Sequence, residues 1–137
     1  MANRWFNQFK GSLERGVVIL DGYVQIQASD AGVVAETIAG ASVARTGTGL
    51  YTITLEDSYN RLLSISLTDV AQGTNANHDW KVKQVLNTAG ADAGATLLNV
   101  KSIVIASCAS TGVPTDPVVD CGLTVHMVFR NSTVGTA

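Results

Sequence analysis

The sequence predicts a mostly β protein, an antiparallel sandwich or barrel of about seven or eight short strands with a short N-terminal helix or arm. Several short segments alternate apolar and small polar residues with the period of two that half-buried strands show. Polar or glycine-rich turn segments separate them, and the spacing of β-α-β units is missing. With 137 residues the chain can form one domain with its own core. We therefore expect an arm over residues 1–16 and a β domain over residues 17–137.

The expected arm contains a concentration of aromatic and basic side chains that no other segment of the chain matches. They are Arg4, Trp5, Phe6, Phe9 and Lys10. The three aromatic residues recur near the spacing of one helix face. The segment therefore suits a helix packed on the domain's own core, an arm that docks on a partner, or a frayed terminus.

The first β-prone residues, 17–20 and 23–26, are joined by Asp21-Gly22, a dipeptide typical of turns. They predict either a tight hairpin or one longer strand with a bulge at Gly22. Residues 28–41 are rich in Ala, Gly and small polar residues, and we expect a loop with a short strand there.

The clearest alternation lies in residues 42–68. The apolar residues Tyr51, Ile53 and Leu55 alternate with polar ones, and Leu63, Ile65 and Leu67 do the same. We expect two antiparallel neighbours, connected by the polar residues 57–61, in a sheet with one covered face.

Three further strands are expected in the second half of the chain. In the first, Trp80, Val82, Gln84 and Leu86 should lie on one side. Residues 97–106 are mostly apolar and predict a central strand rather than an edge strand. The last alternates Leu123, Val125, Met127 and Phe129 with mostly polar residues.

Charge is scarce. Charged residues are 15% of the chain, against roughly 25% in an average globular protein. A domain this small has a large surface for its volume, so its exterior must be poor in charge. Either small polar residues and glycine cover that exterior, or neighbouring subunits do.

The composition also excludes several classes of partner. The net charge is −2 and no run of basic residues occurs, which removes the electrostatic basis for nucleic-acid binding. No stretch approaches the ~18 consecutive apolar residues of a membrane span. Residues 1–6 lack the apolar region of a signal peptide. We expect no nucleic acid and no membrane as partners, and folding in a cytoplasm.

Residues with catalytic chemistry are few and scattered. His78 lies in a polar loop and His126 on the polar side of a strand, where a solvated or interface histidine is the expectation. Glu56 and Asp57 are adjacent at a strand end, and no G-x-S-x-G elbow is present. We expect no enzyme activity, no cofactor and no small-molecule substrate.

Two cysteines, Cys108 and Cys121, flank a segment with two prolines, so a loop could bring them together. In a cytoplasmic protein the default is two reduced, buried thiols, with a disulfide as the alternative. Two cysteines and two separated histidines do not have the spacing of a metal site.

Three segments of the chain resemble small virion structural proteins of tailed bacteriophages, of the capsid decoration or head-associated type. They are the opening residues 1–9, the central block 41–52 and Gly112-Val113-Pro114-Thr115-Asp116-Pro117. Members of that family often have Gly-Glu after the Asp-Pro, where this chain has Val118-Val119. The motifs are structural rather than catalytic.

The resemblance implies a capsid decoration (cement) protein, assembled in the host cytoplasm and located on the virion. Its partners would be the major capsid protein and copies of itself, with a trimer as the expected oligomer. Trp5, Phe6 and Phe9 would be the buried anchors of the arm, and Arg4 and Lys10 its polar rim. The alternatives are a receptor- or carbohydrate-binding fibre or tip module, a tail component, and, as a third class, a small hydrolase.

Overall fold

The computed structural model describes residues 16–27, 32–70, 79–94, 97–108, 112–117 and 121–130. Within these residues the chain forms seven strands and no helix. The strands are β2 (Val17–Ile26), β3 (Val33–Glu36), β4 (Ala41–Gly47), β5 (Leu50–Val70), β6 (Asp79–Asn87), β7 (Leu98–Cys108) and β8 (Cys121–Arg130). All of their ladders are antiparallel. The prediction of a mostly β, antiparallel fold is confirmed.

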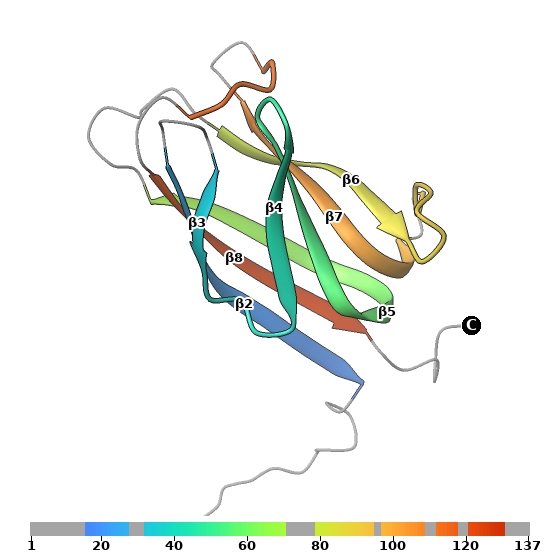
Figure 1. Cartoon of the computed structure of the whole chain (residues 1–137). Coiled ribbons are helices and arrows are strands. Elements are labelled where there is room, and N and C mark those ends of the chain that lie inside the picture. Colours follow the sequence, from blue (N-terminus) through green and yellow to red (C-terminus); the bar gives the residue numbers. More distant parts are fainter. Residues whose placement is uncertain are drawn as a thin grey trace, which may run out of the picture.

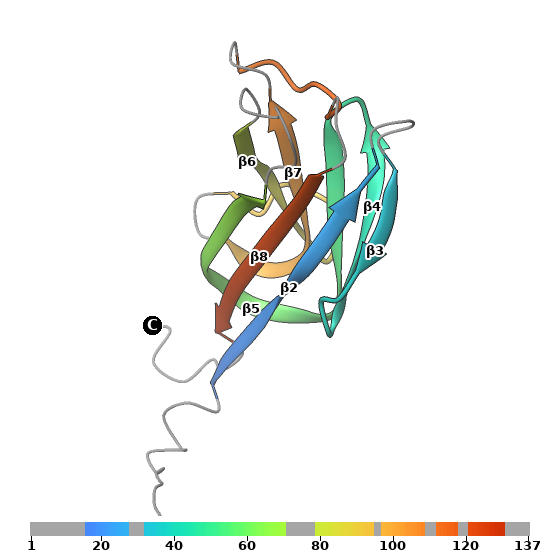
Figure 2. The same ribbon diagram turned by 90° about the vertical axis from the view of Figure 1, so that its left-hand side faces the viewer.

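The strands form one sheet in the order β3-β2-β8-β5-β7-β6, with β4 also paired to β5. The long strand β5 is shared by two halves of this sheet. Its first residues pair with β4 and β7, and its last residues, from Arg61 to Val70, pair with β8. The sheet therefore folds over at β5 into two layers (Figures 1 and 2). We call β3, β2, β8 and the end of β5 the first layer, and β4, the start of β5, β7 and β6 the second layer.

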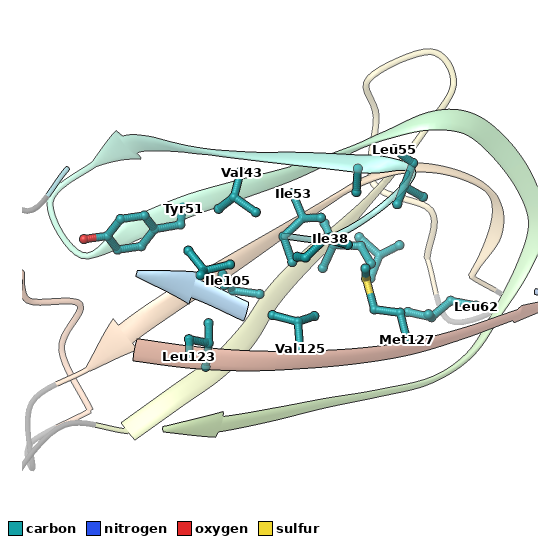
Figure 3. Close-up of a cluster of buried hydrophobic side chains, with 14 of the residues drawn as sticks. Ile38, Val43, Tyr51, Ile53, Leu55, Leu62, Ile105, Leu123, Val125 and Met127 are labelled. Carbon is teal, nitrogen blue, oxygen red and sulfur yellow. The ribbon is translucent and has the colours of Figure 1, made fainter. Parts of the chain in front are cut away.

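The hydrophobic core lies between the two layers (Figure 3). In the second layer, strand register places Val43, Ile53, Ile103 and Val85 in one row across four strands, and all four are buried. In the first layer, β8 contributes the alternating residues predicted from the sequence, Leu123, Val125, Met127 and Phe129, each no more than 1% exposed. The period-two pattern of β8 thus builds one wall of the core.

The expected connection at residues 57–61 is wrong, because β5 runs through it as one continuous strand of 21 residues. Its register against β7 shifts between Thr54 and Tyr59, and there the strand bends from one layer into the other. Tyr59 is buried, and its ring stacks on Phe129 with centroids 4.7 Å apart. An aromatic residue in an otherwise polar stretch therefore fixes the bend in the core.

Bulges also change which side chains face the core. The register of β5 against β8 shifts between Leu62 and Ser64, so Leu62 is buried and Leu63 is 48% exposed. The expectation that Leu63 shares a face with Ile65 and Leu67 is therefore wrong, although those two do pack on the core. An extra residue in a bulge reverses the alternation that a sequence pattern assumes.

Strand β6 shows the same effect. Its register against β7 shifts between Val82 and Gln84, and Val85 rather than Gln84 is buried. Trp80 does lie against the core, with its ring centroid 5.5 Å from that of Tyr51. The expected face is therefore correct before the bulge and wrong after it.

Strands β2, β3 and β7 show the outcome of the expectations for residues 17–26, 28–41 and 97–106. Strand β2 is one strand, paired with β8 over ten consecutive residues without a shift. A Cβ on Gly22 would lie 2.8 Å from the Ile38 backbone, so the glycine allows a close approach rather than a turn. The expected short strand is β3, and β7 is central, between β5 and β6.

Candidate assembly surface and loop clamp

The five residues predicted to contact a partner, Arg4, Trp5, Phe6, Phe9 and Lys10, lie outside the described residues. The first described strand, β2, begins at Val17, where the expected β domain begins. The site is therefore built from the β domain, on which two features stand out. One is a clamp between two loops, and the other is the outer face of the first layer.

The clamp joins residues 41–52 to residues 112–117, two segments that the sequence analysis singled out. Arg45, near the end of β4, binds Asp116 with both of its forked nitrogens, Nη2 to Oδ2 at 2.8 Å and Nε to Oδ1 at 3.2 Å. The N–H of Gly49 donates to the same Asp116 Oδ1 at 2.7 Å. Asp116 is about 70 positions from both Arg45 and Gly49 in sequence, and the two segments meet at one end of the sandwich (Figure 1).

The clamp stabilises the ionised form of Asp116. The hydrogen bond from Arg45 holds the pKa of Asp116 below its usual value of 3.8, and the Gly49 N–H acts in the same direction against the opposing effect of partial burial. A bidentate Arg–carboxylate pair also fixes the relative orientation of its two partners. Arg45 and Asp116 therefore hold the residue 112–117 segment against the β4–β5 turn.

Backbone contacts complete the clamp. Ser107 N–H donates to Gly49 C=O at 2.8 Å, and Thr115 N–H donates to Ser107 C=O at 2.7 Å. Gly49 has φ +67°, and a Cβ placed there would lie 2.4 Å from the Thr115 nitrogen. Only glycine fits this position without strain. The clamp is therefore held by side-chain and backbone hydrogen bonds together.

The outer face of the first layer is arranged in cross-strand rows. Asp21 of β2, His126 of β8 and Ser66 of β5 lie opposite one another. His126 Nδ1 is 3.5 Å from Asp21 Oδ2, and both side chains are about half exposed or more. Sequence reasoning missed this pair because the two residues come from different strands.

The pair lies in a shallow hollow of about 360 Å³, lined also by the hydroxyl residues Ser66, Thr68 and Thr124. The residue types are those of a Ser-His-Asp constellation, but the structure records no hydrogen bond between Ser66 and His126. The hollow is open to water, and the N–H groups of a ladder are already used between strands. The row is therefore an exposed polar patch that contains one His–Asp pair.

Beside this polar row, the same face also carries exposed apolar side chains. Ile19 is 56% exposed, Val17 is 39% exposed, and Val128 lies directly across from Ile19. Leu63 of the neighbouring β5 is also exposed. The outer face of the second layer differs, since hydroxyl residues of β4 and β5 gather there and Thr46 Oγ1 lies 3.2 Å from Thr52 Oγ1. Exposed apolar side chains in a row favour contact with another protein.

Other chemistry finds little support in the described part of the chain. There, no group of three or more His, Cys, Asp or Glu side chains is placed to hold a metal ion. Cys108 and Cys121 are both buried, as expected of structural thiols. The described residues also contain no helix of the length and apolar character needed to span a membrane.

Comparison of the chain with protein-family models, with curated proteins and with solved structures found no match.

Proposed function

We propose that the chain is a non-enzymatic structural protein of a tailed-phage virion, a capsid decoration protein that assembles as an oligomer on the head exterior. Its partners would be the major capsid protein and copies of itself, and no cofactor or substrate is involved. The observation that carries this proposal is the apolar outer face at Val17 and Ile19 in a chain with only 15% charged residues. Covering such a face with another protein is favourable, because it removes apolar surface from water.

The clamp supports the same proposal. The central block, residues 41–52, and residues 112–117 resemble phage head proteins. Arg45 and Gly49 from the first segment bind Asp116 from the second, so both segments have a structural role in this fold. Residues that close one end of a sandwich maintain the shape of the domain. A structural component of a virion works through its shape. This is what we expect of motifs that are structural rather than catalytic.

A carbohydrate-binding module is less well supported. Sugar sites on β-sandwiches use exposed aromatic side chains, because an aromatic ring can pack on the apolar face of a sugar. Among the described residues the aromatic side chains are Tyr23, Tyr51, Tyr59, Trp80 and Phe129, and none of them is exposed. A tail component remains an alternative within the same structural class.

Co-sedimentation with purified capsids tests the proposal. We expect the full-length protein to bind, and a variant lacking residues 1–10 to fold but not to bind, since Trp5, Phe6 and Phe9 are the proposed anchors. Trp5→Ala with Phe9→Ala should weaken binding at least tenfold, about 1.4 kcal/mol or more. The matched control is Asn7→Ala with Gln8→Ala, which changes the same segment without removing an aromatic side chain.

Two results would count against the proposal. Normal capsid binding by the truncated protein would refute the arm as the anchor. Absence of binding by the full-length protein to heads and tails alike would refute the virion role, and a glycan array would then be the next measurement.

A further inference from the structure

The free strand edges of the described fold are not equally protected against pairing with another chain. On β6, Lys81 and Lys83 are exposed near the start, and at its end the Ala93 N–H bonds Val85 C=O. On β4, the Val43 N–H donates to the side chain of Glu36 from the neighbouring β3. Charge, short strands and covering segments are the usual means of preventing edge pairing.

The edge of β5 after Arg61 has no ladder partner among the described residues, but it is bulged at Leu63 and otherwise rich in serine and threonine. Bulges and polar residues also discourage pairing. Residues 17–21 of β2 differ from all of these edges, because four of the five are apolar and the strand has no bulge against β8.

Among the described residues, no strand pairs with the outer edge of β2 along these five residues. Strand β3 pairs with β2 only from Val24 onward, and Thr37 occupies the edge at Tyr23 through its N–H and Oγ1. The N–H and C=O groups of successive residues in a strand point to alternate sides. Those of Val17, Ile19 and Asp21 therefore point to the same side as those of Tyr23. No ladder partner lies there among the described residues. Figure 2 shows this end of β2 extending beyond β3.

We propose that a second copy of this chain adds its own β2 to this edge, antiparallel and about a twofold axis at Ile19. The two Ile19 residues then face each other as a hydrogen-bonded pair, and Val17 of each copy pairs with Asp21 of the other. Val18 of each copy lies opposite Leu20 of the other, beside the cores on which both residues already pack. The contact is isologous, so the same five residues serve both copies.

Charge complementarity identifies the second copy as the occupant. Val17 lies across from Arg130, and Arg130 lies across from Arg61, so one end of the open edge has two basic residues in a row. Asp21 is at the other end. The twofold pairing brings Asp21 of the second copy next to Val17, two strand spacings or roughly 10 Å from Arg130. Extended Arg and Asp side chains can span this distance, and the apolar pair at Ile19 lies between the two charged ends.

The contact is short, and a typical stable interface buries roughly 800 Å² per partner. We therefore expect a dimer that dissociates on dilution in the free protein. On a capsid, the same contact would link neighbouring oligomers across a twofold axis. The inference does not depend on capsid binding, since it concerns the isolated chain.

Disulfide trapping tests the pairing directly. In a hydrogen-bonded antiparallel pair the Cα atoms are about 5.5 Å apart, within the range of a disulfide. We expect Ile19→Cys, incubated with a mild oxidant at high protein concentration, to form a covalent dimer of twice the 14.3 kDa chain mass. The matched control is Val113→Cys, since Val113 is 59% exposed and its segment, residues 112–117, lies at the opposite end of the sandwich from the start of β2 (Figure 1). The native Cys108 and Cys121 are buried and should react slowly.

The trapped dimer should form at least about tenfold faster for Ile19→Cys than for Val113→Cys, because pairing raises the effective concentration of the thiols. Equal rates for Ile19→Cys and Val113→Cys would overturn the proposal. Trapping of Ile19→Cys that is unchanged when the register of the pairing is disturbed would also overturn it. Exchange of the two charges tests that register. Asp21→Arg or Arg130→Asp alone should slow trapping, and the double variant should restore it. Failure of the double variant to restore trapping would also overturn the twofold register.

Discussion

The two ends of the sandwich are finished in opposite ways. At one end, Arg45, Gly49 and Asp116 clamp two loops together with a bidentate ion pair and backbone hydrogen bonds. At the other end, residues 17–21 of β2 present apolar side chains and an edge that pairs with no other strand among the described residues. The first end satisfies polar groups of its loops with one another, whereas within the described part of the chain the outer backbone groups of residues 17–21 have no ladder partner. This difference is the reason for proposing that the β2 end, and not the clamped end, makes the contact between two copies of the chain.

Gly49→Ala should have the largest effect, because it breaks the clamp from within. The new Cβ would have to occupy a left-handed conformation and would lie 2.4 Å from the Thr115 nitrogen. We expect a loss of about 2–4 kcal/mol in the free energy of unfolding, measured with urea.

Gly94→Ala is the control for that experiment, since Gly94 also has positive φ, +70°, but nothing within 4 Å of the added Cβ. It should lose only about 1–2 kcal/mol, the conformational part. Equal losses for the two variants would show that the close contact at the clamp contributes nothing.

Asp116→Asn should have an intermediate effect and should change the pH dependence. The pKa of Asp116 is lowered in the folded chain, so its carboxylate stabilises the fold above its usual pKa of 3.8. That contribution is lost as the pH falls through the lowered pKa. We expect a loss of about 1 kcal/mol near neutral pH, since the pair is partly exposed.

The measurement is urea unfolding of Asp116→Asn and wild type at several pH values, with Asp57→Asn, at an exposed position of β5, as control. The difference between Asp116→Asn and wild type should shrink toward low pH. A difference that stays constant with pH would mean that the loss comes from packing and not from charge.

Ile19→Lys should have the smallest effect on the isolated chain, and so sharpens the contrast between the two ends. Ile19 is 56% exposed, and substitutions at such positions usually change stability by less than about 0.5 kcal/mol. Self-association measured by light scattering should nevertheless fall. A loss above about 1 kcal/mol in dilute solution would instead mean that Ile19 supports the fold of the monomer.

Local patterns predicted much of the fold. Alternation in β8 correctly identified Leu123, Val125, Met127 and Phe129 as one face of a strand, because β8 pairs with both of its neighbours and is itself free of bulges. The apolar run of β7 correctly indicated a central strand. The close approach at Gly22 was not foreseen, since a turn dipeptide and a glycine under Ile38 look the same in sequence.

What could not be predicted depends on contacts between distant residues. The polar stretch 57–61 resembles a connection until Tyr59 is seen to stack on Phe129. The bulges at Leu63 and near Lys83 depend on register, which a single strand does not encode. The Arg45–Asp116 pair and the Asp21–His126 pair each join residues from separate segments. The predicted arm residues lie outside the described residues, so their role stays a prediction.

The length of β5 has a consequence for how the protein comes apart. Because one strand belongs to both layers, unfolding of either layer removes the ladder partners of half of β5 and uncovers the core that the two layers share. The domain should therefore melt as a single cooperative unit, and amide protons in the middle of β5 should exchange with solvent only through global opening. The same long-range pairing gives a high contact order, so that refolding is expected in milliseconds to seconds rather than microseconds.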